Sequence, residues 1–532
     1  MSELIYRTEE LTKEQISDLY VASDYEQSII EKLKSPTPVL LKGSRGVGKS
    51  FLFKICEIQM QEEFDSKRVL PVTITFRKAS LLRSGNEYQF QYWMLGRICS
   101  ELLRALKKIG LISSASSSFS GFCVKADDDN TRIDQIIQHF EDSWKNPGVM
   151  VDADAIPSLD DFLDTVEDIC EELRIDRIVL FIDEAAHVFY PQQQREFFTL
   201  FRDLRSPYVK CNAAVYPGVT VYGDTFEPVH DAIEISINRS INDDHYVGKM
   251  KEMVLRQVKE GRLATILSKN SENFTLLAYA ASGNPRYLLK SIDLAEKMDS
   301  ASVNRVFREY YRGDLWAEHT KLSERYPGYQ KIIDWGRDFI ENIVLPELKK
   351  KNDSFIDEGV GKGTTLYFWI HKNAPHEVKE ALRILEYSGI VYEEASGMRA
   401  TRSEIGTRYM VNIGSLLSLE ATPTSVGIKI VNNSDLRRMT EYGANYPAYK
   451  NIQGCVVADQ TIELQTQLNK DIELLDLSEY QKTKLHELGL NTIGDLVNSS
   501  EESLKRVKYI ADVRARMIKN SAIAAVCEYL LG

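Results

Sequence analysis

"VLLKGSRGVGKSFL", residues 39–52, decides the fold. The apolar run at its start predicts a buried strand. After it, Gly43, four residues, then Gly48, Lys49 and Ser50 have the spacing of a P-loop. Glycines let the backbone curl so that successive N–H groups point inward, and the helix that follows adds its positive end. The stretch therefore predicts a strand, a phosphate-binding nest and a helix in that order.

The individual residues of this loop have predicted roles. Lys49 is expected to reach the β- and γ-phosphates, and the Ser50 hydroxyl to hold Mg²⁺. The alternative is a glycine-rich turn between a strand and a helix with no ligand. The apolar helix that follows, with Leu52 and Ile55, favours the nucleotide site. The predicted nucleotide contacts are Gly43, Ser44, Arg45, Gly46, Val47, Gly48, Lys49, Ser50 and Phe51.

A second acidic motif is required for hydrolysis, and "RIVLFIDEAAHVF" at 177–189 supplies it. The apolar run 178–182 is typical of a strand covered on both faces of a parallel sheet. We expect this strand to lie beside the P-loop strand. Asp183 would hold the Mg²⁺ shell, and Glu184 would polarise the attacking water as the catalytic base. Read alone, the two acids could instead be the first turn of a helix.

Composition describes an ordinary globular chain. The 532 residues allow about three domains of roughly 150 residues. The amino terminus lacks the apolar core of a secretory signal, and no stretch is long enough to span a membrane, so we expect a cytoplasmic protein. Seven scattered cysteines without a CxxC pair favour a reducing compartment and disfavour a zinc site. A net charge of −12 argues against a protein that coats nucleic acid indiscriminately.

The first 242 residues alternate strand and helix signals, which predicts an α/β sandwich with a mostly parallel sheet. Residues 112–160 break this pattern and are expected to be an insert with a helix near 131–145. From about 242 onward the pattern becomes helical. The other predicted elements of the first region are strands at 68–76, 209–216 and 232–237 and helices at 88–110 and 192–205.

The P-loop, the "IDE" strand and "GNPRYLL" at 283–289 together resemble AAA+ ATPases, in particular the origin-recognition initiators and the STAND signalling ATPases. The resemblance covers roughly residues 10–300. It implies ATP and Mg²⁺ as ligands, and a helical lid in which Arg286 is a catalytic sensor of the γ-phosphate and Pro285 packs near the adenine. From the residues alone, a proline and an arginine after a glycine also suit a plain helix start.

One departure from the ring-forming members is the missing arginine finger. Residues 217–231 contain no arginine or lysine, where such a finger would complete a neighbouring subunit's site. Its absence can lower phosphoryl transfer by ~10³ or more, which predicts a slow switch. Substitutes of different geometry are Arg202, Arg205 and Arg239, and candidates for the other sensor are Asn212 and Tyr216.

Residues 375–414 predict a helix with Val378 and Leu385 on one face, followed by two strands with a turn at "SGM", 396–398. A helix followed by a β-ribbon is similar to a winged helix, which initiator ATPases carry at this place. If it binds DNA, the helix enters the major groove and Arg399 and Arg402 contact the backbone. A structural or protein-contact module is the alternative.

Residues 477–526 resemble the helix-hairpin-helix domain that closes the bacterial RNA polymerase alpha subunit. The "LGLNTIGDL" turn and the "SSEESL" helix start carry the resemblance. Tyr509, Ile510 and Ala511 replace the glycines that let a hairpin approach a phosphate. A protein-interaction module is therefore the alternative. The basic residues that would flank DNA are Lys505, Arg506 and Lys508, with Arg514 and Arg516.

The resulting plan is an α/β P-loop NTPase of the AAA+ type, with a parallel sheet sandwiched by helices, a helical lid, a winged-helix domain and a small all-α helix-hairpin-helix domain. One hypothesis is a DNA-associated ATPase, initiator-like or in phage defence, that grips double-stranded DNA. The other is a STAND-like switch that binds a partner protein and forms homo-oligomers under nucleotide control. The predicted domains are 1–242, 243–300, 301–417, a linker at 418–465, and 466–532.

Overall fold

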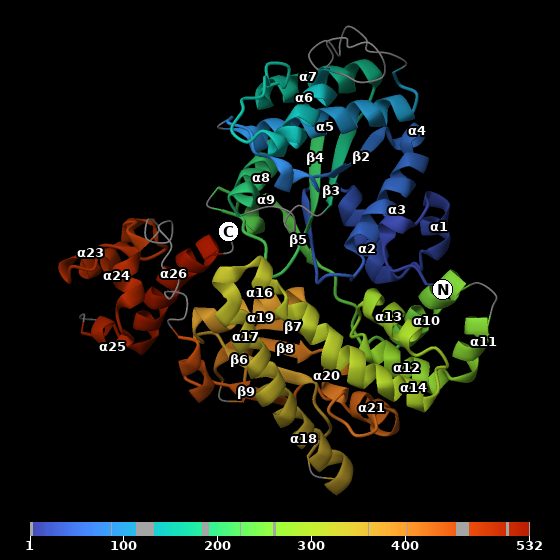
Figure 1. The fold of residues 1–532 in the computed structure, drawn as a ribbon, viewed down its shortest axis with the longest axis vertical. Helices are drawn as coiled ribbons and strands as arrows, with labels where there is room; N and C mark the ends of the chain where they lie inside the picture. Colours follow the sequence, from blue (N-terminus) through green and yellow to red (C-terminus); the bar gives the residue numbers. More distant parts are fainter. Residues whose placement is uncertain are drawn as a thin grey trace.

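The computed structural model describes most of the chain. Two bodies lie one above the other, and a small helical module lies at the side of their junction (Figure 1). The described residues are 4–86, 88–112, 132–183, 191–223, 225–258, 262–359, 361–401, 403–453, 468–506 and 510–530.

The upper body contains a five-stranded parallel sheet in the order β2-β3-β4-β1-β5. This sheet confirms the α/β P-loop NTPase fold. It differs from the prediction in one respect, because β4 lies between the P-loop strand β1 and the acidic strand β3. Crossover packing sets the order of parallel strands, and the apolar pattern of a single strand carries no information about it. The strands are β1 (Val39–Lys42), β2 (Val69–Thr75), β3 (Arg177–Asp183), β4 (Val209–Val215) and β5 (Ile233–Ser236).

Each face of this sheet has its own core, because alternate strand residues point to opposite sides. Leu41 and Phe181 pack with helices α1, α2 and α3, whereas Leu40 and Leu180 pack with α5, α6, α7 and α8. The helices are α1 (Lys13–Leu19), α2 (Asp24–Lys34), α3 (Lys49–Glu62), α4 (Phe64–Lys67), α5 (Gln89–Lys108), α6 (Arg132–Asp142), α7 (Leu159–Leu173), α8 (Pro191–Asp203) and α9 (Pro228–Asp231), with short 3-10 turns η1 (Thr8–Glu10), η2 (Ala79–Leu81) and η4 (Ser143–Lys145).

The predicted insert contains the expected helix, α6, whose apolar side joins the core beside α5. Residues 113–131 of the insert lie outside the described residues.

The lid and a helical connector follow the sheet. The region predicted to be the lid, which keeps that name below, contains α10 (Tyr246–Val258), α11 (Arg262–Lys269), α12 (Ser271–Ala280) and α13 (Pro285–Leu294). Two long helices of the connector each contain a π-helical segment, η5 and η7, and Pro346 follows the second one. The connector elements are α14 (Ser300–Val306), η5 (Phe307–Asp314), α15 (Leu315–Thr320), α16 (Leu322–Arg325), η6 (Pro327–Tyr329), α17 (Gln330–Phe339), η7 (Ile340–Val344) and α18 (Leu345–Glu358).

The lower body holds a second sheet in the order β7-β8-β6-β9, in which only β6 and β9 are parallel neighbours. The predicted helix is α19 (His376–Tyr387), followed by the predicted ribbon of β7 (Val391–Arg399) and β8 (Ile405–Val411). The "SGM" stretch is a bulge inside β7 and not the turn, which lies at 400–404. The other strands are β6 (Tyr367–His371) and β9 (Met439–Tyr442).

Residues 418–453, the described part of the expected linker at 418–465, contain helices and a strand. Residues 454–465 lie outside the described residues. Helix α21 (Pro423–Asn432), strand β9 and the 3-10 turn η8 (Pro447–Asn451) lie within 418–453, after α20 (Ile413–Leu417). Ile430 and Tyr442 are buried in the same core as the lid and connector. The elements of this range are short and contain few apolar residues, so the sequence resembled a linker. The pairing of β9 with β6 places β9 in the second sheet.

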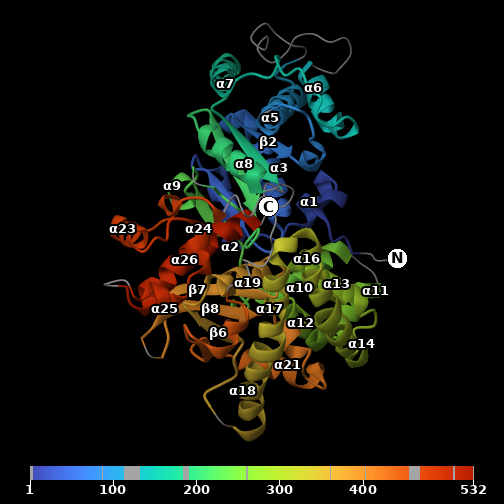
Figure 2. The ribbon, with the colours of Figure 1, turned by 60° about the vertical axis from the view of Figure 1, so that its left-hand side comes forward.

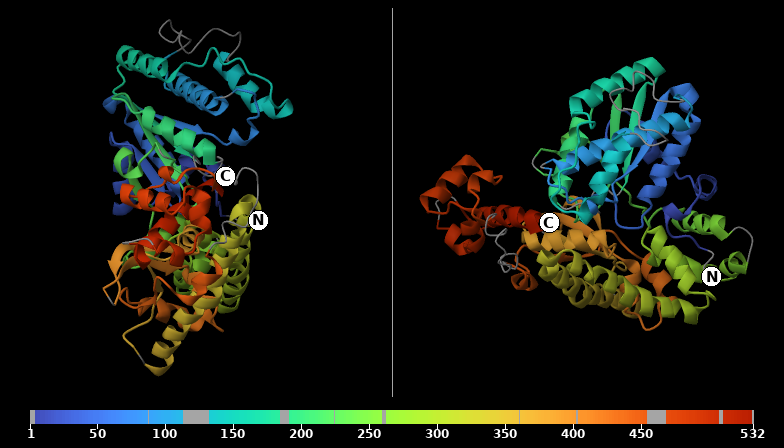
Figure 3. Two further views of the ribbon diagram at one scale, coloured as in Figure 1. Left: turned by 90° about the vertical axis from the view of Figure 1, so that its left-hand side faces the viewer. Right: turned by 45° about the horizontal axis from the view of Figure 1, so that its top comes forward.

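The described residues of the carboxyl-terminal module form helices joined by turns, and the module lies beside the lower body in the other views as well (Figures 2 and 3). Gly489 ends α23 with a φ of 74°, and Thr492 caps α24 through a capping box. The elements are η10 (Ile472–Leu474), α23 (Glu479–Glu487), α24 (Ile493–Asn498), α25 (Glu501–Leu504) and α26 (Asp512–Leu530). Within the described ranges, no helix combines the length and apolarity that crossing a bilayer needs.

Candidate nucleotide site

The P-loop has the backbone that its glycines predict. Gly46 and Gly48 have φ values of 89° and 99°, in the left-handed region that favours glycine. Gly48 is also the N-cap of α3, so the positive end of a 14-residue helix faces the loop. A side chain at Gly46 would come within 2.8 Å of the Cβ atom of Arg286. Both glycines are therefore required, one of them by the lid that packs on it.

Lys49 is buried and turned toward its own loop. Its Nζ donates to the carbonyl oxygens of Gly43 at 2.6 Å and Ser44 at 3.2 Å. The same Nζ lies 3.6 Å from the centre of the Tyr216 ring. Tyr216 directly follows β4, and the register of Lys42 with Val215 brings it to the P-loop edge of the sheet. An aromatic face and two carbonyls thus stabilise the ammonium group.

The cleft around the loop suits an anionic ligand. It measures about 1320 Å³ and is lined by the P-loop, the amino-terminal segment, the lid and the connector. Its described lining includes ten Lys or Arg residues against five Asp or Glu, in a chain whose net charge is −12. The Ser44 hydroxyl is buried in the loop and has no hydrogen-bond partner among the described residues. An unsatisfied donor and excess positive charge both fit a phosphate chain.

Of the two predicted acids, only one lies in the described residues. Asp183 ends β3 in register with Thr75 at the end of β2, so it lies at the carboxyl edge of the sheet. This is the edge that carries the P-loop, where a magnesium ligand is expected. Glu184, the predicted base, lies outside the described residues.

Asn212, one candidate sensor, lies in the middle of β4, away from the carboxyl end of the strand that faces the P-loop. It is in register with Val39, the first residue of β1, and its Nδ2 donates to the Leu33 carbonyl of α2 at 3.1 Å. Tyr216 is the candidate that contacts the site, through Lys49.

The lid contacts the P-loop through Asn284, a residue that the sequence analysis did not single out. Its Nδ2 donates to the Arg45 carbonyl at 2.9 Å, and its Oδ1 accepts from the Arg286 N–H at 3.1 Å as the N-cap of α13. Pro285 and Arg286, the residues of the predicted lid that were expected to contact the nucleotide, both line the cleft. An asparagine before a proline is a helix-start signal, and this signal was available in the sequence.

The lower body also reaches the P-loop, which no sequence signal indicated. The Arg45 N–H donates to the carbonyl oxygen of Tyr387, the last residue of α19, at 3.2 Å. The Tyr387 ring lies 5.5 Å from the Tyr216 ring. Next in the chain, Ser388 accepts a hydrogen bond from the lid's Tyr287 through its carbonyl and contacts His319 Nδ1 at 2.8 Å through its hydroxyl. The end of α19 therefore joins the P-loop, the lid and the connector.

The three arginines considered as finger substitutes have different positions. Arg202 pairs with Asp203 at 2.8 Å and donates to the Thr225 carbonyl, and Arg205 is an exposed residue after α8. Arg239 lines the cleft and donates to the P-loop carbonyl of Val47 at 2.7 Å. Only this last arginine, among the three, contacts the site.

Helix α19 is enclosed, which differs from a helix that enters a major groove. Eight of its twelve residues are buried. Burial alone would raise the pKa of Glu380, but the Arg383 guanidinium at 2.7 Å and His376 at 3.3 Å lower it to about 2. Arg383 also packs its backbone against Gly218 of the upper body. Glu380 is thus paired with two basic residues of its own helix.

The predicted DNA contacts are spread over two surfaces. Arg399 is exposed at the end of β7, and Arg506 is exposed after α25. Lys505 Nζ pairs with Glu502 at 2.7 Å and also with Asp512. Arg402 and Lys508 lie outside the described residues.

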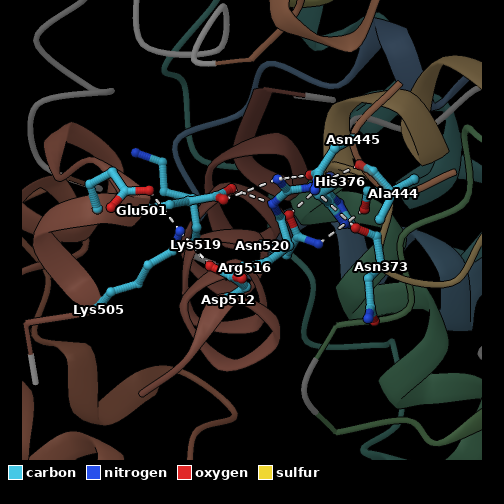
Figure 4. Close-up of polar contacts among 12 residues, drawn as sticks. Asn373, His376, Ala444, Asn445, Glu501, Lys505, Asp512, Arg516, Lys519 and Asn520 are labelled. Atoms are coloured by element: carbon cyan, nitrogen blue, oxygen red, sulfur yellow. Dashed lines mark hydrogen bonds and ion pairs between the residues drawn. The ribbon is translucent and has the colours of Figure 1, made fainter. Parts of the chain in front are cut away.

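Arg516, expected in the basic flank, points into the junction between the module and the lower body (Figure 4). It is 8% exposed, pairs with Glu501, and donates to the Asn373 and Ala444 carbonyls at 3.2 and 3.1 Å. Beside it, Asn520 accepts from the His376 N–H at 3.0 Å. Helix α26 is thereby held against the start of α19.

Comparison with known proteins gives one family match. Residues 4–78 match the family model ORC-CDC6-like, and the P-loop lies within them. The resemblance to origin-recognition initiators is therefore confirmed for this part of the chain. No curated protein matches.

Three similar solved structures are distant in sequence. They are the Aeropyrum pernix ORC2 protein in ADPNP-ADP complexes (10% identity, TM-score 0.31, 79% of this chain and 92% of that chain), the Aeropyrum pernix ORC1 protein in complex with DNA (12%, 0.32, 78% and 96%) and AMPPCP-bound DnaA from Aquifex aeolicus (13%, 0.25, 62% and 84%).

Proposed function

We propose that this chain, an AAA+-type P-loop NTPase whose residues 4–78 match the ORC-CDC6-like model, is an ATP-operated switch. ATP and Mg²⁺ would bind at the P-loop edge of the parallel sheet, and hydrolysis would be slow. What changes with nucleotide state is the contact of the lid and the lower body with the P-loop.

The observation that carries this proposal is the pair of hydrogen bonds made by the backbone of Arg45. Its N–H is bonded to the Tyr387 carbonyl of the lower body, and its C=O to Asn284 of the lid. In a P-loop these backbone N–H groups are the ones that cradle phosphates. Phosphate binding at this loop therefore competes with, or repositions, the bond to the lower body. A ligand shifts a two-state equilibrium only through such a difference in contacts.

The residues of the site support ATP chemistry. Lys49, Ser50 and Asp183 are at one edge of the sheet, and Mg²⁺ held by the last two would neutralise developing charge on the phosphates. Lys49 would exchange its loop carbonyls for phosphate oxygens. Glu184 remains the proposed base for water attack, and Arg286 the proposed sensor.

The first experiment measures binding and turnover of ATP by the purified full chain. Glu184→Gln should keep MgATP binding and abolish turnover, because it removes the base and leaves the phosphate contacts. Glu196→Gln, on the next helix, is the matched control for a lost carboxylate. A wild-type chain that fails to bind MgATP would overturn the proposal, and hydrolysis by Glu184→Gln would remove that residue as the base.

The second experiment tests the switch. Gly389 lies two residues after Tyr387, whose carbonyl oxygen accepts from the Arg45 N–H, and a side chain there would come within 2.8 Å of the Tyr287 hydroxyl. Gly389→Val should loosen the α19 contact and raise ATP affinity relative to wild type, whereas Gly443→Val, at a glycine with open space around it, should not. Equal ATP affinity in the two folded variants would count against coupling through α19.

DNA association is a second candidate function, supported by the initiator resemblance and by exposed Arg399 at the end of the β7–β8 ribbon. The enclosed α19 leaves the ribbon as the part of a winged-helix-like unit that could contact a duplex. ATP turnover with and without duplex DNA, at two salt concentrations, tests this. Stimulation that fades with salt supports DNA contact because phosphate contacts release counterions.

The alternative output is a protein partner or a nucleotide-dependent homo-oligomer, as in a STAND-like switch. The inward orientation of Arg516 and the paired Lys505 favour a protein-contact role for the carboxyl-terminal module. No stimulation by DNA, together with an ATP-dependent increase in mass by light scattering, would support it. A role in phage defence and a cytoplasmic location remain extensions of the resemblance and the sequence.

A further inference from the structure

Arg239 is the one residue described above that contacts the P-loop, the amino-terminal segment and the lid at the same time. It follows β5, which is the neighbour of the P-loop strand in the sheet. Its Nη1 donates to the Val47 carbonyl at 2.7 Å and lies 3.4 Å from the Gly283 carbonyl of the lid. Its Nε and Nη2 pair with Glu26 Oε1 of α2 at 3.0 and 2.6 Å.

Two glycines adapt the surroundings to this side chain. A Cβ on Gly283 would lie 2.7 Å from the Arg239 carbonyl oxygen, so the lid backbone can approach only because Gly283 has no side chain. A Cβ on Gly48 would lie 3.5 Å from Nη2, in contact with the guanidinium. The Arg239 guanidinium therefore packs against Gly48, the N-cap of α3.

The hydrogen bond from Arg239 to the Val47 carbonyl also orients the Gly48 N–H, a donor of the phosphate nest. The Val47–Gly48 peptide is trans, since the described chain has no cis bond. In a planar trans peptide the C=O and the N–H point in opposite directions. Holding the Val47 carbonyl on the Arg239 side thus turns the Gly48 N–H to the other side. The orientation of one nest donor is set by a residue almost 200 positions away in the sequence.

We propose that Arg239 is a positioning residue of the phosphate nest: it fixes the Val47–Gly48 peptide for phosphate binding and links that peptide to the lid. Glu26 balances the charge of Arg239, so Arg239 acts by orienting the peptide and not as a free cation. The inference rests on the proposed ATP function and names a residue that neither the P-loop motif nor the lid motif contains. Because the β-phosphate is common to both ligands, ATP and ADP should depend on Arg239 alike.

The test compares Arg239→Ala with a matched arginine. Arg256 also pairs with an acid, Glu252, and also donates to backbone carbonyls of the amino-terminal segment, but these contacts lie away from the P-loop. We expect Arg239→Ala to weaken binding of fluorescent ATP and ADP analogues by about 10-fold or more, in parallel, and to raise KM more than it lowers kcat. Arg256→Ala should stay within about 3-fold of wild type.

Two further variants separate positioning from a general loss of structure. Arg239→Lys keeps the charge but offers a single ammonium in place of the forked guanidinium, and should give an intermediate loss. It also serves if Arg239→Ala does not fold. Glu26→Gln leaves the Val47 bond in place and should change affinity by less than about 3-fold.

The outcomes distinguish this inference from the proposed function. If wild type binds no MgATP, the proposed function fails. If wild type binds, but Arg239→Ala and Arg239→Lys bind both nucleotides as tightly as Arg256→Ala does, the positioning role is overturned. A loss confined to ATP, with ADP binding unchanged, also overturns it, because that result points to direct γ-phosphate contact.

Discussion

The nucleotide cleft and the carboxyl-terminal module use basic residues in opposite ways. In the cleft, cations outnumber carboxylates ten to five among the described lining residues. In the module, Arg516 and Lys505 pair with acids, and Lys519 donates to carbonyls at the end of α24. A basic run in a sequence therefore says little about an anionic ligand until the partners of each charge are known.

The largest effect that we expect from this contrast is the loss of ATP affinity when Lys49 is replaced. Lys49→Ala should weaken ATP binding by about 2–5 kcal/mol, because a buried charge contact to phosphate is lost. Isothermal titration with MgATP measures it. Lys54→Ala, one turn along the same helix and paired with Glu57 at 2.8 Å, is the control and should bind like wild type. Equal losses in both variants would show that the cleft does not use Lys49 as proposed.

The next effect concerns the module. Arg516→Ala should lower the free energy of unfolding by about 2–3 kcal/mol, because Glu501 and two carbonyls lose a buried partner. Urea denaturation measures it, and ATP affinity should not change. Arg514→Ala, exposed on the same helix, should cost less than about 0.5 kcal/mol. If Arg516→Ala is as stable as Arg514→Ala, the docked arrangement of the module is not the solution state.

A smaller effect is expected where the lid meets the P-loop. Asn284→Ala removes a helix N-cap and the hydrogen bond to the Arg45 carbonyl. We expect a loss of about 1–2 kcal/mol in stability, with weaker ATP binding. Asp299→Ala removes the N-cap of α14, away from the cleft, and should lower stability without affecting ATP. Unchanged ATP binding in Asn284→Ala would separate the lid from the site.

The stability of the contact between the connector and the end of α19, where His319 lies, should also depend on pH. Burial, with the nearby Arg337 charge, lowers the pKa of His319 to about 4. The folded-state pKa is below the unfolded value of about 6.5. The stability that the neutral His319 imidazole contributes is therefore present above pH 6.5 and is lost as pH falls toward 4. Between pH 7.5 and 5.5, wild type should lose about 1 kcal/mol more than His319→Asn. Parallel melting curves of the two proteins would refute a buried neutral imidazole.

The smallest effect is expected on duplex binding by the module. Arg506→Ala should change DNA affinity by less than about 2-fold and leave the salt dependence unchanged if the module binds protein. Each phosphate contact that is lost lowers the slope of log K against log salt by about 0.9. Arg399→Ala in the ribbon is the comparison. A slope change at Arg506 but not at Arg399 would make the module the DNA-binding surface.

Local patterns predicted much of the upper body. Strand and helix periods can be detected in a window of about ten residues. The sequence therefore predicted the strands around Leu41 and Phe181, the helix from Gln89 and the start of α13. Residues 418–453 were wrongly predicted to belong to a linker, because the four residues of β9 are recognisable as a strand only through their pairing with β6. The turn at 396–398 was misread because a bulge and a turn favour the same residues, Ser and Gly.

By itself, the sequence determined the phosphate-binding loop: glycine spacing, a lysine and a helix start are local properties of Gly43 to Ser50, and backbone conformation there depends on neighbouring residues. Only the tertiary structure decided what surrounds that loop. Arg239, Asn284 and Tyr387 reach it from three other elements. Their contacts depend on strand order and on docking of the lower body, and these follow from burial summed over the whole chain, which no short stretch encodes.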